Sequence, residues 1–314
     1  MKTLIHNPTK KLRDFLFKGI LLVTALAVFN ACNDDDNSTS ANNEPGTIDE
    51  VAQSNDNFST LVSALQDVGL VTALRGTGPF TVFAPTNDAF ANLPDGLLES
   101  LTNEQLTEIL SHHVISAEIA SGDLQAEQTA TALAGGDLFV TVAGGNVTVN
   151  GSSQVTNADI DASNGIIHAV NQVLLPDSYQ DVVGIVAKRY LLQTLEDAVV
   201  QAGLGGTLQQ STQDGYTVFA PVNSAFDGID LSTLSQEQLQ GILTYHVLPA
   251  KVLSSDISSG TVTTVNGATL EISVGGDGSV SLTDQAGNTY QVTTADLEGT
   301  NGVVHIIDGV LMPA

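Results

Sequence analysis

Histidine is the residue type with the greatest chemical potential in this sequence. Five of the six histidines follow residue 31, and four of these form two repeated pairs. The pairs are His113 with His246 and His168 with His305. An imidazole titrates near neutral pH and ligates transition metals, so clustered histidines could provide general acid–base catalysis or a metal site. The alternative is a histidine that is buried and hydrogen-bonded within a protein core.

The positions of these histidines favour the structural role. His113 lies four residues after Ile109 and three after Leu110, so it shares the apolar face of a predicted helix. His168 alternates with Ile166 along a predicted strand and points to the same side. We therefore predict polar atoms within hydrogen-bond distance of both ring nitrogens, no catalytic residue and no metal site. Convergence of His113, His168 and a carboxylate at metal-ligand distances would contradict this interpretation.

Composition and motifs argue against several other kinds of chemistry. The sequence lacks the Gly-x-Ser-x-Gly, Gly-x-Gly-x-x-Gly and His-Glu-x-x-His patterns and the lysine-containing phosphate-binding loop. A single cysteine cannot form an internal disulfide, a cysteine-rich zinc site or an iron–sulfur cluster. Nine basic residues against 35 acidic ones, a net charge of −26, leave no basic stripe for nucleic acid. We expect no enzymatic activity, no cofactor and no nucleic-acid partner.

Residues 1–31 have the pattern of a secretory signal peptide. Five basic residues come before residue 19, an apolar run covers residues 19–29, and Asn30 and Ala31 separate this run from Cys32. A transmembrane anchor would need about 18 or more apolar residues. The segment resembles the signal of a bacterial lipoprotein of the Bacteroidota type, which implies cleavage before Cys32 and a lipid on its thiol. A free thiol after ordinary signal cleavage is the alternative.

Residues 32–46 are predicted to form an acidic flexible tether, because they contain almost no apolar side chains. The acidic run after Cys32 resembles a surface-export signal of Bacteroidota lipoproteins, and a solvated spacer is an equal alternative. Residues 1–31 contain one of the 35 acidic residues and five of the nine basic residues. The remaining chain therefore carries 34 acidic and four basic residues, a net charge of −30. Such a surface repels polyanions and anionic membranes. We expect an outer-membrane or cell-surface location, with the periplasmic side as the alternative.

The rest of the chain consists of two copies of one sequence pattern. Residues 81–90 return as residues 217–226 with eight of ten positions identical, at an offset of 136. Two further segments return at offsets of 133 and 137, which indicates a duplicated domain rather than short solenoid repeats. We predict domain 1 over residues 47–176, a short linker over 177–181 and domain 2 over 182–314.

Each copy reads as helices first and strands later, which predicts the α+β class. In domain 1, capping boxes begin helices at Thr47 and Thr102, and the latter is matched by Ser235 in domain 2. Glycine-rich turns predict a β-hairpin in each copy. A final strand is predicted over 166–175 and again over 303–312.

An alternation of acidic residues before that final strand raises the question of calcium. Asp159, Asp161 and Ser163 precede Gly165. An EF-hand loop needs glycine at its sixth position and glutamate at its twelfth, whereas here the glycine is seventh and the twelfth residue is Val170. We therefore interpret these residues as a turn leading into the strand.

Three repeated motifs resemble the signatures of a fasciclin (FAS1) domain. In domain 1 they are residues 81–90, the His113-Val114 pair that ends the middle helix, and residues 164–176. The resemblance covers nearly all of the chain after the tether. It implies two tandem domains, each a wedge-shaped β-sandwich with a helical layer, found in secreted or surface-attached proteins. It also implies adhesion through partner proteins or carbohydrate, without enzymatic activity.

The resemblance also names candidate partner-binding residues. Tyr245-His246 matches a Tyr-His motif that is linked to integrin binding in animal members of the family, and domain 1 has His112-His113 at the same place. A structural role for these four residues is the favoured alternative. If the motif contacts partners, the two domains should differ, because His112 replaces the tyrosine.

Together these observations predict a lipid-anchored adhesion or matrix-interaction protein that binds extracellular protein or polysaccharide. The rival interpretation is a surface lipoprotein that binds or handles carbohydrate. The sequence leaves the ligand and the oligomeric state open.

Overall fold

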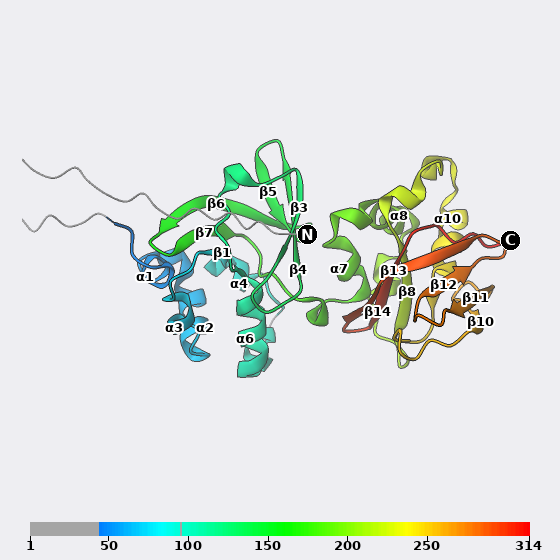
Figure 1. The fold of residues 1–314 in the computed structure, drawn as a ribbon, viewed down its shortest axis with the longest axis horizontal. Coiled ribbons are helices and arrows are strands. Elements are labelled where there is room, and N and C mark those ends of the chain that lie inside the picture. Colours follow the sequence, from blue (N-terminus) through cyan, green and yellow to red (C-terminus); the bar gives the residue numbers. More distant parts are fainter. Residues whose placement is uncertain (1–43, 95) are drawn as a thin grey trace, which may run out of the picture. The chain divides into compact units, whose positions relative to one another are not determined.

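The computed structural model describes residues 44–314 apart from Asp95 (Figure 1). The predicted signal peptide, the lipid attachment at Cys32 and the tether up to residue 43 lie outside the described residues. Helices and strands are grouped below by the predicted domain in which they lie.

Domain 1 contains short helices and a seven-stranded sheet. Its helices are α1 (Ile48–Gln53), α2 (Ser59–Asp67), α3 (Val71–Leu74), α4 (Asn87–Ala91), α5 (Leu97–Ser100) and α6 (Asn103–His112). Its strands are β1 (Phe80–Pro85), β2 (Val114–Ile115), β3 (Glu127–Thr131), β4 (Asp137–Ala143), β5 (Asn146–Val149), β6 (Ser153–Ala162) and β7 (Gly165–Val170).

Domain 2 repeats this order with fewer α-helices. Its helices are α7 (Val182–Ala187), α8 (Gln193–Ala202), α9 (Gly205–Leu208) and α10 (Gln236–Tyr245). Its strands are β8 (Tyr216–Pro221), β9 (Val247–Leu248), β10 (Gly260–Thr263), β11 (Thr269–Val274), β12 (Val280–Thr283), β13 (Thr289–Gly299) and β14 (Gly302–Ile307). Short 3₁₀ helices cover Asp56–Phe58, Ser121–Asp123, Asp177–Tyr179, Tyr190–Leu192, Asn223–Phe226 and Leu231–Thr233.

Local capping signals place the middle helices where the sequence predicted them. The Thr102 hydroxyl accepts a hydrogen bond from the Gln105 amide (3.3 Å), and the Gln105 side chain accepts one from the Thr102 amide (2.9 Å). Ser235 and Gln238 make the same reciprocal pair at the start of α10. Each box satisfies two amides that the first turn of a helix leaves unpaired. Both predicted helix starts and both predicted hairpins are confirmed.

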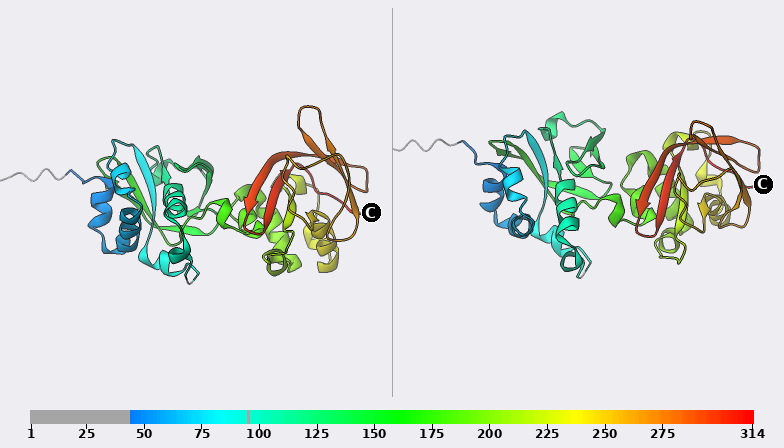
Figure 2. Two further views of the ribbon diagram at one scale, coloured as in Figure 1. Left: turned by 90° about the horizontal axis from the view of Figure 1, so that it is seen from below. Right: turned by 60° about the horizontal axis from the view of Figure 1, so that its bottom comes forward.

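The sheet of each domain is one continuous hydrogen-bonded ladder. Its strand order is β2-β1-β7-β6-β5-β4-β3 in domain 1 and β10-β11-β12-β13-β14-β8-β9 in domain 2. The long strands β6 and β13 contain register shifts, and each pairs with strands of both halves of its sheet. The two layers of the expected sandwich are therefore two ends of one bent sheet, which the helices flank (Figure 2). The α+β prediction is confirmed.

The last strand of each domain is shorter than predicted. The apolar pattern predicted strands over 166–175 and 303–312, but β7 and β14 each end five residues earlier, at 170 and 307. After β7, the Asn171 side chain accepts a hydrogen bond from the Gln154 amide (2.7 Å). The chain then turns inward, and the Leu174 amide donates to the buried His113 ring (2.8 Å). An amide that donates to a side chain cannot continue the hydrogen-bond ladder of a strand. The strand therefore ends before the apolar run does.

Alternation along β1 divides the core of domain 1 in two. Val82 and Ala84 face the helices and pack with the helical core cluster, whereas Phe83 faces the interior of the bent sheet. The parallel neighbour β7 alternates in the same way, and its His168 is directly opposite Phe83. His168 therefore lies inside the sheet, on the side that its alternation with Ile166 predicted.

A buried cluster of charges follows the end of domain 1. The Asp177 carboxylate bonds Lys188 (2.5 Å) and Arg189 (2.6 Å), and these two cations are only 4% and 5% exposed. The Arg189 guanidinium lies 5.0 Å from the centre of the Phe139 ring, which Tyr190 contacts edge-on. Burial alone would raise the pKa of Asp177, but Arg189 and then Lys188 hold that pKa below its usual value. Two of the four basic residues after residue 31 are thus used inside the protein.

Candidate functional site

The paired histidines at the ends of the middle helices are fully used in hydrogen bonds. The His113 ring donates from Nδ1 to the Ile109 carbonyl (2.7 Å) and accepts at Nε2 from the Leu174 amide. His246 makes the same bonds, to the Ile242 carbonyl (2.9 Å) and from the Leu311 amide (2.9 Å). This arrangement requires the neutral ring with its proton on Nδ1. Each histidine ties the end of a helix to the segment that follows the last strand.

The second pair of histidines is held just as fully, in the opposite tautomer. His168 donates from Nε2 to the Ile119 carbonyl (2.9 Å) and accepts at Nδ1 from the Asp159 amide (3.2 Å). The Asp159 amide can reach the ring because this residue sits at an irregularity of β6 with a φ of 56°. His305 and Asp296 repeat the arrangement in domain 2. For these four histidines, the predicted polar partners of both ring nitrogens are present.

The acidic alternation before the last strand serves the fold. Asp159 and Asp161 lie within β6 and not in the predicted turn. The Asp159 carboxylate accepts hydrogen bonds from the amide and hydroxyl of Ser121, and these bonds lower the pKa of the carboxyl. Among residues 44–314, Asp95 aside, no group of three or more His, Cys, Asp or Glu is arranged to hold a metal ion.

The four candidate partner-binding residues are all buried. Tyr245, His246, His112 and His113 are each at most 2% exposed. The Tyr245 hydroxyl donates to the Thr269 carbonyl (2.8 Å). The two copies differ at this position, and the difference lies inside the protein. None of these side chains forms part of the surface that the structure describes.

His112 is the exception among the described histidines. Neither of its ring nitrogens makes a hydrogen bond to another described residue, although the side chain is buried. We expect His112→Tyr to stabilise domain 1 by about 1–2 kcal/mol, because it removes two unsatisfied nitrogens and restores the residue of domain 2. The carbonyl that corresponds to that of Thr269 is the carbonyl of Asp137.

Urea unfolding of His112→Tyr beside His112→Phe would check this expectation. The phenylalanine variant also removes the nitrogens but offers no hydroxyl, so the difference between the variants reports the new hydrogen bond. Loss of stability in both variants would show that the site is filled by the imidazole and has no unmet hydrogen-bonding need.

Burial of neutral histidines predicts acid sensitivity. Burial lowers the pKa of His113 to about 3 and the pKa values of His112 and His246 to about 4. In the unfolded chain these rings titrate near 6.5, so the unfolded state binds more protons below that pH. Stability should therefore fall as the pH drops from 6.5 toward 4. At pH 5 each of these three rings costs about 2 kcal/mol, and burial also lowers the pKa of His305, so that ring adds to the loss in domain 2.

Unfolding free energies measured at pH 7 and pH 5 would check this acid sensitivity. His112→Tyr serves as the internal control, since it should remove about half of the histidine contribution to the acid effect in domain 1 and none in domain 2. An acid effect in domain 1 that His112→Tyr leaves unchanged would contradict the assignment.

Two repeated asparagines have structural roles that their sequence positions did not reveal. Asn164 is buried, accepts from the Ile48 amide (2.9 Å) and donates to the carbonyls of Leu74 and Gly76 (both 2.7 Å). Asn301 bonds the equivalent groups of domain 2. Their recurrence before glycine was the available signal. Both copies of this motif thus hold helices to the sheet and are not exposed for recognition.

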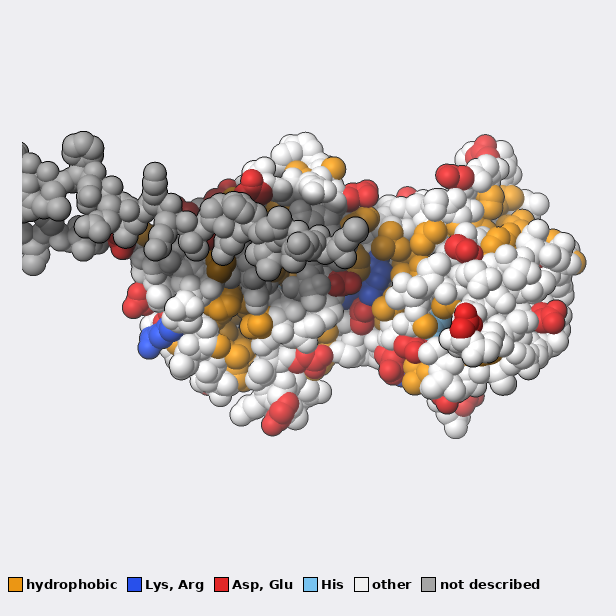
Figure 3. Space-filling model, viewed as in Figure 1, with side chains coloured by type: hydrophobic (Ala, Val, Ile, Leu, Met, Phe, Trp, Pro, Cys, Tyr) orange, Lys and Arg blue, Asp and Glu red, His pale blue; other side chains and the backbone are white. Residues whose placement is uncertain are grey.

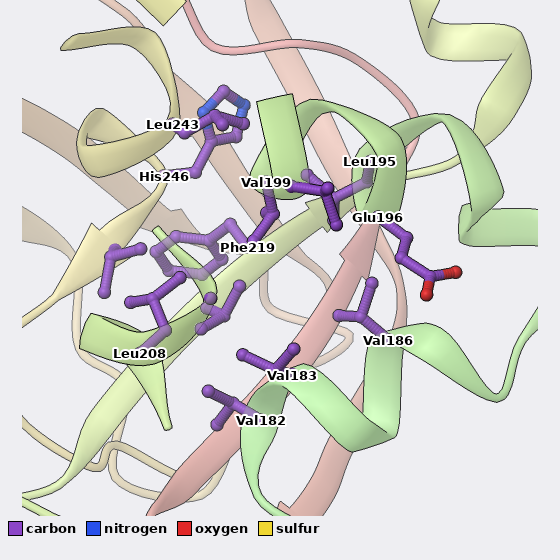
Figure 4. Close-up of a pocket in the computed structure, with 14 residues that line it drawn as sticks. Val182, Val183, Val186, Leu195, Glu196, Val199, Leu208, Phe219, Leu243 and His246 are labelled. Atoms are coloured by element: carbon purple, nitrogen blue, oxygen red, sulfur yellow. The ribbon is translucent and has the colours of Figure 1, made fainter. Parts of the chain in front are cut away.

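The helical layer of domain 2 contains an apolar cavity. It lies between α7, α8 and α9 and the underlying strand β8, has a volume of about 80 Å³ and is partly open to solvent (Figure 4). The related space of domain 1, beside α2 and α3, has a volume of about 10 Å³. The sequence gives no signal of this cavity, since its lining residues follow an ordinary apolar pattern.

Comparison with known proteins agrees with this architecture. A fasciclin domain model matches residues 56–176 and 191–313, so the chain belongs to the fasciclin (FAS1) family. The FAS1 domain pair from the insect cell adhesion molecule Fasciclin I has the same fold, with a TM-score of 0.58 at 19% identity over 82% of this chain and 98% of that one.

Relatives by sequence come from animals and bacteria. Human periostin is 31% identical over 271 residues, which cover 85% of this chain and 31% of periostin. Protein sll1483 of Synechocystis sp. is 48% identical over 143 residues, which cover 44% of this chain and 78% of that protein. The transforming growth factor-beta-induced protein ig-h3 of Sus scrofa is 31% identical over 240 residues, covering 76% of this chain. The chain spans about a third of the length of periostin and of ig-h3.

No helix in the described part of the chain combines the length and the apolar character needed to cross a bilayer.

Proposed function

We propose that this chain is a non-enzymatic adhesion protein that a lipid at Cys32 holds outside the cytoplasm, and that its FAS1 domains bind extracellular protein or polysaccharide. The observation that supports this most is the inward placement of the repeated motifs. Their histidines and asparagines bond the protein's own backbone, so the motifs build two scaffolds and leave the outer surface for contacts.

The surface charge restricts the kinds of partner that we expect. Acidic side chains are scattered over the face shown in Figure 3, and lysine and arginine appear in few places. Lys188 and Arg189 are moreover buried. A surface of this kind disfavours polyanions and favours neutral or basic partners. We therefore expect neutral glycans or basic protein segments rather than sulfated or phosphorylated polymers.

The anchor and the location are tested in cells. Cys32→Ser should move the protein from the membrane fraction to the soluble exported fraction, with no change in folding. Protease treatment of intact cells should release peptides from both domains if the protein faces outward. Retention of the Cys32→Ser protein in membranes would refute the anchor.

Binding is tested with the purified mature chain on arrays of extracellular proteins and of neutral and acidic glycans. Protein partners recovered at moderate salt support adhesion. Glycan binding that survives chelation, with no protein partner, would favour the rival carbohydrate-binding function. Hydrolysis of common esters or glycosides, with a pH optimum, would contradict a non-enzymatic role.

A further inference from the structure

The helical layers of the two domains should be equally well packed, since both follow one sequence pattern, yet the cavity in the helical layer of domain 2 has a volume of about 80 Å³ and the related space of domain 1 about 10 Å³. Figure 4 shows apolar side chains from α7 and α8 converging on it. Val200, which is 72% exposed, also lines the cavity, so the space has an opening to solvent. A ligand could therefore enter without unfolding the domain.

Substitutions between the copies contribute to the extra space, although the lining residue Val186 is larger than its counterpart Ala52. Equivalent positions are fixed by the helix ends: Val182 and Ile48 each begin a first helix, and Gly205 and Val71 each begin a third. At three positions that line the cavity, domain 2 has the smaller residue. The replacements are Ile48 by Val182, Leu65 by Val199 and Val71 by Gly205. The lining atoms of such a space lose dispersion contacts, which destabilises a domain that leaves it empty.

A carboxylate stands at the edge of this apolar space. Among the described residues that line it, Glu196 is the charged one, and domain 1 has Val62 at the same place on its helix. Figure 4 shows Glu196 on α8 on the side of the cavity away from His246. Burial raises the pKa of Glu196, while the Gln193 side chain donates to it (2.9 Å). His246 offers no free hydrogen-bonding group to a ligand, because both its ring nitrogens already make hydrogen bonds within the protein.

Both features disfavour the empty state, and one kind of ligand relieves both. An apolar chain restores the missing contacts, and a cationic head restores a partner to the half-buried carboxylate. We propose that domain 2 binds an aliphatic chain with an amine head, with the chain between α7, α8 and α9 and the ammonium at Glu196. Anionic amphiphiles such as fatty acids are disfavoured by the same carboxylate.

Calorimetric titration of the mature chain with small probes tests the proposal. n-Hexylamine should bind more than tenfold tighter than n-butylamine, because each buried methylene contributes about fourfold. Hexan-1-ol should bind more weakly than n-hexylamine, and hexanoate should show no binding. Glu196→Gln should weaken n-hexylamine binding about tenfold and leave hexan-1-ol binding unchanged.

A matched pair of glycine variants separates the cavity from general attraction to an acidic surface. Gly205→Val restores the residue of domain 1 and should abolish hexylamine binding by filling the cavity. A Cβ at Gly205 meets no atom within 4 Å, so the variant should fold. Gly206→Val is the control, since Gly206 is in the same helix, is equally open and does not line the cavity.

Each outcome decides a part of the proposal. Equal hexylamine binding by the natural protein and Gly205→Val would show surface adsorption only and overturn it. Equal affinity for hexylamine and hexan-1-ol would overturn the role of Glu196. No binding of any probe to the folded natural protein would show that the cavity is an unoccupied packing defect. Circular dichroism of each variant confirms that it folds.

Discussion

Replacement of Asp177 by asparagine should destabilise the protein by about 4 kcal/mol, although the side chain keeps its shape. The carboxylate neutralises two cations, Lys188 and Arg189, that are both almost fully buried. Removing one member of a buried ion cluster leaves uncompensated charge in a poorly solvated place, which typically costs about 3–5 kcal/mol. Arg189 keeps its bond to the Ile185 carbonyl (2.5 Å) and its place over Phe139, so part of the packing should survive.

Urea unfolding followed by circular dichroism would measure this loss. Asp181→Asn is the matched control, because it removes the same charge from the same linker. Its side chain accepts a hydrogen bond from the Gly184 amide (2.8 Å), and asparagine can accept it equally well. The control should change stability by less than about 0.5 kcal/mol. Similar losses in both variants would point to net charge, and not to the buried cluster.

Asn164→Ala should destabilise domain 1 by about 4 kcal/mol. The substitution leaves the Ile48 amide and the carbonyls of Leu74 and Gly76 without their partner, and each buried group that loses its hydrogen bond costs about 1–3 kcal/mol. These bonds hold the first and third helices to the turn before the last strand. Thermal or urea unfolding, followed at the transition of domain 1, would measure this loss of stability.

Two companion variants sharpen this prediction. Asn146→Ala removes an exposed asparagine of the same domain and should have little effect. Asn164→Asp keeps the acceptor for Ile48 but sets a carboxylate against two carbonyl oxygens, so it should not rescue stability. Full stability of the aspartate variant would mean that the two bonds to carbonyls contribute little.

The features that sequence reasoning found are those that depend on neighbours along the chain. Capping boxes at Thr102 and Ser235 need residues only three positions apart, and hairpins need only a turn between two short strands. The structural role of His113 followed from its helical spacing to Ile109. Local spacing indicated that the ring was on an apolar face, but not that the Leu174 amide would be its second partner.

The features that sequence reasoning missed depend on segments far apart in the chain. The predicted strand over 166–175 is too long, because the amide of Leu174 turns to a histidine 61 residues away and leaves the ladder. The role of Asn164 also depends on distant segments, since one of its hydrogen-bond partners is an amide 116 residues earlier. The sequence favoured a structural role for Tyr245, but it could not identify the partner of the hydroxyl, which is the carbonyl of Thr269 in β11.

Amino-acid order alone was enough to establish two domains of the α+β class, the FAS1 resemblance and histidines suited to a core, because repeats, caps and periodicity are encoded over short distances. It could not separate a packed helical layer from a hollow one. The loss of a few methyl groups at Val182, Val199 and Gly205 keeps the apolar pattern unchanged. Whether that loss leaves a space depends on how three helices close over the sheet, which is a property of the folded chain.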